Sequence, residues 1–163
     1  MRAGTWGAIG TGVRGEPGFV SIAASATASS LASANRAAGS RATALAAIAA
    51  KHATIDARLD AYQRLFANVL RDGHRLCMCG MLSADFDALP ANVRREVRAF
   101  FDDNELWLAK IFADAKRPRP KLSARVVLSA FEGAMLVARA YGDVGRFEAV
   151  ARSVVAQLMR DDD

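Results

Sequence analysis

The stretch LSARVVLSAFEGAMLVARAY, Leu122–Tyr141, decides the fold class of this chain. It is apolar on nearly all sides and has the length of a single helix, so it needs cover on more than one side. Its best apolar run, Val126–Ala140, contains Glu132 and Arg139 and is too short to span a bilayer. The segment therefore predicts a buried helix in an all-α protein, with no membrane-spanning helix.

An amphipathic helix is predicted on each side of this segment. The upstream helix should run from Pro90 to about Ala115, and the breaker Lys116–Pro120 follows it. Downstream, Gly142 ends the central helix, and Asp143 can cap a last one that reaches Arg160. The upstream stripe consists of Val93, Val97, Phe100, Phe101, Asn104, Leu108, Ile111 and Phe112, and the downstream stripe of Phe147, Val150, Val154, Val155 and Leu158.

Two further helical regions precede these. Apolar residues from Leu45 to Arg71 follow a helical period, and Asp56 is a possible cap for a second helix that starts near Thr54. Another helix is expected over residues 75–88, ending before Pro90. Residues 45–160 thus predict an antiparallel helical bundle.

Residues 1–44 form a leader rich in Gly, Ala and Ser. Large apolar residues are sparse there, so the segment buries too little surface to offset the entropy of ordering. We expect disorder or a misassigned reading-frame start. A weak secretory signal or transit peptide over Gly18–Ala34 is the alternative.

Composition supports one globular domain. The chain has 163 residues, 52% of them hydrophobic and 24% charged, and a net charge of +5. Its basic residues are interspersed with acidic ones, so charge alone does not indicate nucleic-acid binding. With only two cysteines, two positions apart and poorly placed for a disulfide, the chain is expected in the reducing cytoplasm.

Five phrases along the helices carry a family resemblance. They are VLRDG (Val69–Gly73), RLCMCGML (Arg75–Leu82), LP (Leu89–Pro90), VRAFFD (Val97–Asp102) and FEGAMLVAR (Phe131–Arg139). In order and spacing they resemble the C-terminal domains of a bacterial subgroup of TetR-family (tetracycline-repressor-like) transcriptional regulators, over about two thirds of the chain. The resemblance implies a repressor's regulatory domain that forms a homodimer and senses a small-molecule effector.

The resemblance also assigns residues to a ligand pocket and to a dimer interface. Middle helices would enclose the pocket, and the last two would pair with a second subunit. The expected pocket residues are Tyr62, Phe66, Met78, Met81, Leu82, Phe100, Phe101, Trp107 and Phe131. The expected interface residues are Ala130, Gly133, Ala134, Val137, Ala138, Phe147, Val150, Val154 and Leu158. Residues of both kinds are also expected in an ordinary hydrophobic core that contains no ligand and no interface.

A TetR-family regulator reads DNA through an N-terminal helix-turn-helix, and residues 1–43 do not resemble one. DNA contact is therefore expected only through a domain not seen in this sequence. Two alternatives follow from that expectation. The chain could be an interaction module that forms heterodimers with an intact relative, or an inert fragment of a truncated or frameshifted regulator.

No catalytic motif, metal site or cofactor is predicted. Cys77 and Cys79 have one residue between them, which is too few for a zinc knuckle or a thioredoxin-type pair. They are either a thiol sensor, activated if His74 lies close, or small apolar residues on a packed helix. The prediction is a protein that is not an enzyme.

Overall fold

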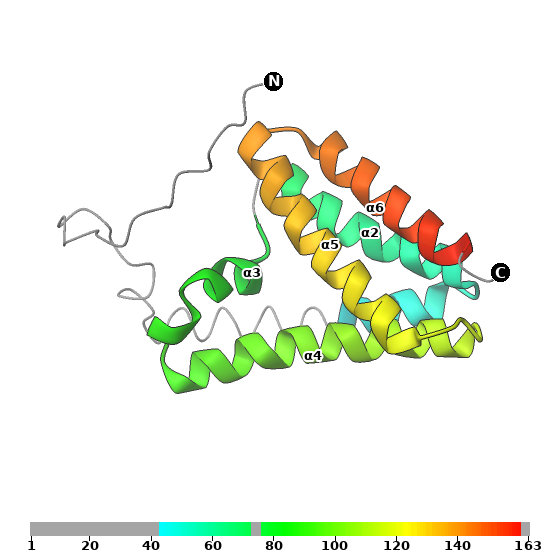
Figure 1. Cartoon of the computed structure of the whole chain (residues 1–163), viewed down its shortest axis with the longest axis horizontal. Coiled ribbons are helices and arrows are strands. Elements are labelled where there is room, and N and C mark those ends of the chain that lie inside the picture. The colour runs from blue at the N-terminus through cyan, green and yellow to red at the C-terminus, as the bar shows by residue number, and fades with distance from the viewer. Residues whose placement is uncertain (1–42, 73–75, 161–163) are drawn as a thin grey trace, which may run out of the picture.

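The computed structural model describes residues 43–72 and 76–160, all of whose regular elements are helical. A helical segment over 43–51 comes first. It is followed by α2 (Ile55–Arg71), α3 (Met78–Leu82), the 3-10 helix η2 (Ser83–Ala88), α4 (Ala91–Asp114), α5 (Pro120–Tyr141) and α6 (Val144–Arg160). Helices α5 and α6 lie side by side and antiparallel, α2 packs against both, and α4 crosses the start of α5 (Figure 1). The predicted all-α bundle is confirmed.

The break near Thr54 is confirmed, but its capping residue differs from the expected Asp56. The Thr54 hydroxyl accepts a hydrogen bond from the backbone N–H of Ala57 at 3.3 Å. Asp56 lies in the first turn of α2, where a carboxylate stabilises the helix dipole. A hydroxyl directly before the first helical residue reaches the unpaired N–H groups better than a carboxylate inside the turn.

Helix α5 begins earlier than Leu122. Pro120, expected to be part of the breaker, occupies the first turn, where its missing N–H removes no hydrogen bond. Pro90 is also displaced from its expected place and precedes the first residue of α4. At the other end of α5, Gly142 adopts a left-handed φ of 63°, and the Asp143 carboxylate accepts a hydrogen bond from the Gly145 N–H at 2.9 Å.

The helix expected over 75–88 is wrong. Only Met78–Leu82 is α-helical, and η2 follows with a non-helical residue at Asp85. The Ser83 hydroxyl donates a hydrogen bond to the Cys79 carbonyl at 2.8 Å, which competes with the regular helical ladder. Within these two elements only Cys79 is buried, so packing provides little to enforce a longer helix.

An aromatic cluster joins α2, α5 and α6. Phe131 is fully buried, and its ring centroid lies 5.5 Å from that of Phe66 and 5.4 Å from that of Phe147. Both contacts are edge-to-face, the arrangement that aromatic quadrupoles favour. Tyr62 adds a ring stacked on Phe131 at 5.8 Å. The core is therefore centred on rings from three helices.

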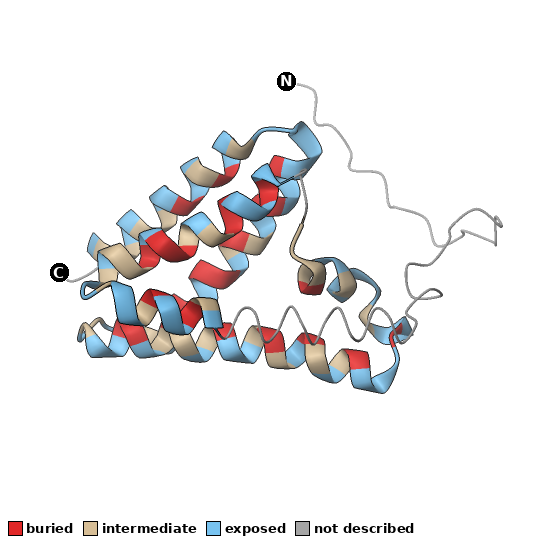
Figure 2. Cartoon of the chain, turned by 180° about the vertical axis from the view of Figure 1, so that it is seen from behind, coloured by how far each residue is buried: buried red, intermediate tan, exposed pale blue. Residues whose placement is uncertain are grey.

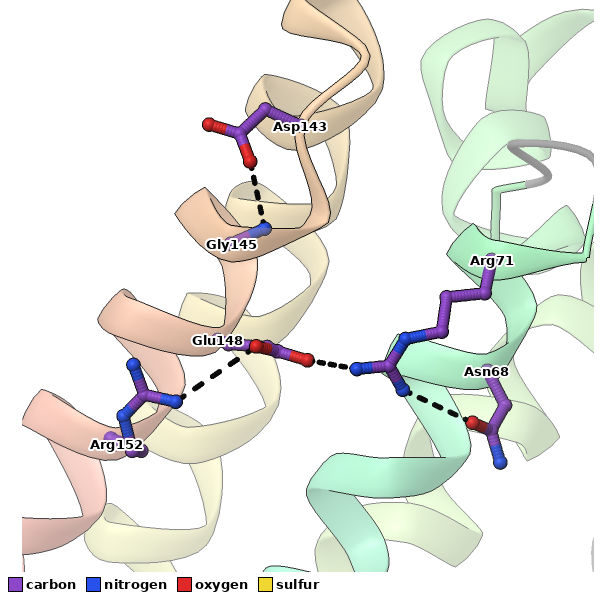
Figure 3. Close-up of polar contacts among 6 residues, drawn as sticks. All are labelled: Asn68, Arg71, Asp143, Gly145, Glu148 and Arg152. Carbon is purple, nitrogen blue, oxygen red and sulfur yellow. Dashed lines mark hydrogen bonds and ion pairs between the residues drawn. The ribbon is translucent and has the colours of Figure 1, made fainter.

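Polar contacts connect the helices at the ends of the bundle. On the surface, Glu148 of α6 forms ion pairs with Arg71 of α2 and with Arg152 (Figure 3). Between α4 and α5, Arg117 donates a hydrogen bond to the Leu158 carbonyl at 2.8 Å, near the C-terminal end of α6. A cation at this end satisfies a helix carbonyl and complements the helix dipole.

Buried positions recur on successive turns of α5 and α6, with exposed ones between them (Figure 2). The expected leader over 1–44 falls almost wholly on residues 1–42, which lie outside the described residues, as does His74. None of the helices in the described ranges combines the length and hydropathy that crossing a bilayer requires.

Phe131→Ala should lower the free energy of unfolding by about 3–5 kcal/mol, because it removes a ring that packs against three others and leaves a cavity. Urea denaturation followed by circular dichroism measures the change. Leu106→Ala is the control, since Leu106 is 69% exposed and its loss should change stability by less than about 0.5 kcal/mol. Equal effects of the two substitutions would contradict a core centred on Phe131.

Candidate ligand-binding site

A cavity of about 300 Å³ lies among α2, α3 and α4. Its walls come from the helical segment 43–51, from α2, from α3 and the residue before it, from α4, and from one residue of α5. The lining consists of Ala44, Leu45, Tyr62, Leu65, Phe66, Val69, Cys77, Met78, Cys79, Phe100, Asn104 and Met135. No charged side chain is among these described residues, so the cavity is apolar with a few polar groups.

One face of α2 provides the longest wall. Tyr62, Leu65, Phe66 and Val69 follow the spacing i, i+3, i+4 and i+7, which places them on the same side of a helix. Residues from the α3 region form the opposite wall.

The polar part of the lining is a buried pair, Tyr62 and Asn104. The Tyr62 hydroxyl donates a hydrogen bond to Asn104 Oδ1 at 2.9 Å, and Asn104 Nδ2 donates to the Phe100 carbonyl at 2.7 Å. Each side chain is 1% exposed. Because a buried polar group without a partner is destabilising, this pairing explains how Asn104 is accommodated in the apolar stripe of α4.

Aromatic rings fix the position of Tyr62. Trp107 stacks on it with centroids 5.4 Å apart, and Phe131 stacks on it at 5.8 Å. Tyr62 therefore belongs both to the core and to the cavity wall. Any ligand that displaces its ring must disturb both contacts.

The Glu132 carboxylate of α5 lies against α3. It accepts a hydrogen bond from the Cys77 thiol, and a Cβ atom on Gly80 would overlap it. Gly80 thus leaves room for the Glu132 carboxylate, which a side chain at this position would displace. Burial raises the pKa of the Cys77 thiol, and the negative charge of Glu132 raises it further.

These findings weigh against the thiol sensor. A reactive cysteine needs a lowered pKa, whereas burial and Glu132 hold the Cys77 thiol protonated. Cys79 is buried, and both cysteines line the cavity. The activating residue considered from sequence, His74, lies outside the described residues. Nor do the described residues contain a group of three or more His, Cys, Asp or Glu side chains placed to hold a metal ion.

Four residues of the expected pocket lie on the cavity wall: Tyr62, Phe66, Met78 and Phe100. The other five lie elsewhere. Met81 is 40% exposed, and Leu82 and Phe101 pack on a second cluster around Val93, Val97 and Phe100. Trp107 and Phe131 contact Tyr62 but are not among the lining residues.

Sequence reasoning missed six lining residues: Ala44, Leu45, Leu65, Val69, Asn104 and Met135. Three of them had a usable signal. Leu65 and Val69 share a helix face with Tyr62 and Phe66, and Asn104 is a polar residue within an apolar stripe, which signals a buried polar partner. Nothing in the local sequence indicated Met135, because its place depends on how α5 packs.

The expected interface residues divide into two groups. Ala134, Ala138 and Phe147 are buried in the core of this chain. Gly133, Val137 and Val150 are exposed, and Ala130, Val154 and Leu158 are half-buried. A residue buried within the chain is not free to contact a second one, so only the second group remains available.

These features define the class of protein: over its described residues, an all-helical bundle with a small apolar cavity that opens to the surface. Comparison with solved structures identifies its fold. A TetR-family transcriptional regulator from Agrobacterium tumefaciens is similar with a TM-score of 0.71 and 25% identity, over 76% of this chain and 70% of that chain. A TetR transcriptional regulator from Legionella pneumophila is similar with a TM-score of 0.68 and 23% identity, over 77% and 70%.

No protein-family model matches the sequence, and no curated protein matches it. The chain has the TetR-like fold, which confirms the resemblance seen in its sequence at the level of the fold. Both similar structures are described as transcriptional regulators and neither as an enzyme.

Cys77 should react with a maleimide at least about tenfold more slowly in the native chain than in the denatured chain, because its raised pKa leaves little thiolate at neutral pH. Mass spectrometry of a Cys79→Ser variant would isolate this reaction. Glu132→Gln should accelerate it, since the substitution removes a negative charge that raises the pKa of the Cys77 thiol. Rapid native labelling would instead support a thiol sensor.

Proposed function

We propose that this chain is the effector-binding and dimerising domain of a TetR-like transcriptional regulator that acts in the cytoplasm and is not an enzyme. The observation that carries the proposal is a TetR-like fold with an apolar cavity on one side of α5 and an exposed apolar face on the other. A regulator needs both features, one to receive a signal and one to associate.

The dimer face is formed by the outer sides of α5 and α6. Leu122, Val126, Leu136 and Val137 of α5 and Val150 of α6 are each 39–52% exposed. A groove between the helices, whose lining also includes Arg119 and Gln157, brings Leu122 and Val126 together with Val154 and Leu158. Contiguous apolar surface of this kind marks an association site, and a second copy related by twofold symmetry would cover it.

Small residues favour close approach at the centre of this face. Gly133 is exposed, and a Cβ atom added to it would meet nothing within 4 Å. A partner helix could therefore approach the α5 backbone closely at this point. The proposed interface keeps Gly133, Val137, Val150 and the half-buried residues of the expected set, and it adds Leu122, Val126 and Leu136.

Helix α5 connects the ligand cavity with the dimer face. Met135 lines the cavity, while the next two residues, Leu136 and Val137, lie on the dimer face. A ligand that shifts α5 would change the angle between two subunits. In a chain with a helix-turn-helix, this change would move the two DNA-reading heads off successive half-sites. Residues 1–42, on which the expected absence of that domain rests, are outside the described residues.

The same apolar face supports a second function, heterodimer formation with an intact relative. Mixing this chain with a full-length relative and measuring the release of operator DNA would test this function. If no mixed dimer forms and no operator DNA is released, heterodimer formation is contradicted. An inert fragment would instead be degraded rapidly, so limited proteolysis of the purified chain distinguishes that alternative.

Light scattering after size-exclusion chromatography should give a mass of twice the 17.4 kDa of one chain. Val137→Lys should shift the protein to monomer, because it places two charges opposite each other in an apolar interface. The matched control is Leu106→Lys, which changes an exposed apolar residue of α4 and should leave the dimer intact. A monomeric wild-type chain would contradict the proposal.

A further inference from the structure

We infer that the cavity among α2, α3 and α4 takes an uncharged, largely hydrocarbon ligand about the size of two fused rings, with one hydrogen-bonding oxygen. The inference rests on the proposed function and adds the chemical class of its effector. Four properties of the cavity support it: its volume, the absence of charged side chains from its described lining, its aromatic walls and the polar pair Tyr62–Asn104.

Volume sets the size of the ligand. The cavity measures about 300 Å³. That is roughly twice the ~150 Å³ of an engineered apolar cavity that holds one benzene molecule. It is also at the lower limit of cavities that bind small molecules, about 300 Å³. A molecule with two fused six-membered rings, or a compact one of equal bulk, therefore fits better than a drug-sized effector.

Charge excludes ionic ligands. The described lining contains no Asp, Glu, Lys or Arg, so an ion that enters loses its hydration without gaining a charged partner. The nearby Glu132 carboxylate is engaged by the Cys77 thiol and lies against Gly80, and Glu132 is not among the lining residues. Its negative field opposes the entry of an anion.

The walls favour a flat ring. Tyr62, Phe66 and Phe100 each present an aromatic ring to the cavity, and such rings attract another ring edge-to-face or in an offset stack. Met78 and Met135 complete the wall. Their unbranched, polarisable side chains adapt to the shape of the ligand. The site therefore selects an apolar ring compound of suitable volume and does not require one exact molecular shape.

Asn104 supplies the polar contact. Its amide nitrogen carries two hydrogens, and the bond to the Phe100 carbonyl uses one of them. The other can donate to an oxygen on the ligand. Because the Tyr62 hydroxyl holds Asn104 Oδ1 at 2.9 Å, the orientation of the amide is fixed before any ligand arrives.

The test compares three probes with one ring system: naphthol, naphthalenesulfonate and naphthylmethylammonium, titrated calorimetrically into the full chain. Naphthol should bind, and each ion should bind at least about tenfold more weakly. Val69→Trp, which adds bulk to the cavity wall, should weaken naphthol binding at least about tenfold. Leu106→Trp adds the same bulk to an exposed site on α4 outside the cavity and should bind naphthol like the wild type.

The double variant Tyr62→Phe/Asn104→Leu tests the polar contact. It replaces both partners by apolar groups of similar shape, so the fold should persist while naphthol binding weakens roughly three- to tenfold. Unchanged binding would overturn the assignment of the ligand oxygen to Asn104.

Three results would overturn the ligand class: no naphthol binding, equal or tighter binding of either ion, or full naphthol binding by Val69→Trp. Light scattering on the same samples separates this failure from failure of the proposed function. A dimer without a preference for naphthol refutes only the ligand class, whereas a monomer that prefers naphthol refutes the dimeric regulator and leaves the ligand class standing.

Discussion

The edge-to-face packing of Phe131 against Phe66 and Phe147 is the contact on which the rest of the structure depends. It joins α2 to the consecutive helices α5 and α6, and Phe131 also holds Tyr62 by stacking. From Tyr62 the chain of contacts continues through Asn104 to α4. The cavity is therefore formed around side chains that the core itself keeps in place, so its polar pair is preorganised.

Helix α5 has two structural roles because it lies between the core and the outer surface. Its buried side supplies Phe131 to the core and Met135 to the cavity, and its outer side carries Leu136 and Val137. A helix that is apolar nearly all round is suited to this position between a ligand and a second chain. Glu132 is a charged residue of this helix, and Gly80 makes room for it beside α3.

The predictions of helices succeeded where apolar periodicity and capping residues define a helix, and failed where they do not. Apolar stripes located α4, α5 and α6, and Gly142 and Asp143 marked the ends of two of them. The region after residue 75 was predicted as one helix because its composition permits a helix, but little of it is buried and Ser83 bonds to a backbone carbonyl. That failure matters for function, since this irregular segment forms one wall of the cavity.

The sequence by itself determined the fold class, the order of the helices and the resemblance to TetR-family regulators, because hydrophobic period and capping residues act over a few positions. Tertiary structure decided which apolar residues are core, cavity or outer face. Ala134, Ala138 and Phe147 are buried inside the chain, whereas Gly133, Val137 and Val150 are exposed, although all six belong to the same two helices. The helical period determines which residues share a side of one helix, but only the packing of neighbouring helices determines which side faces the core.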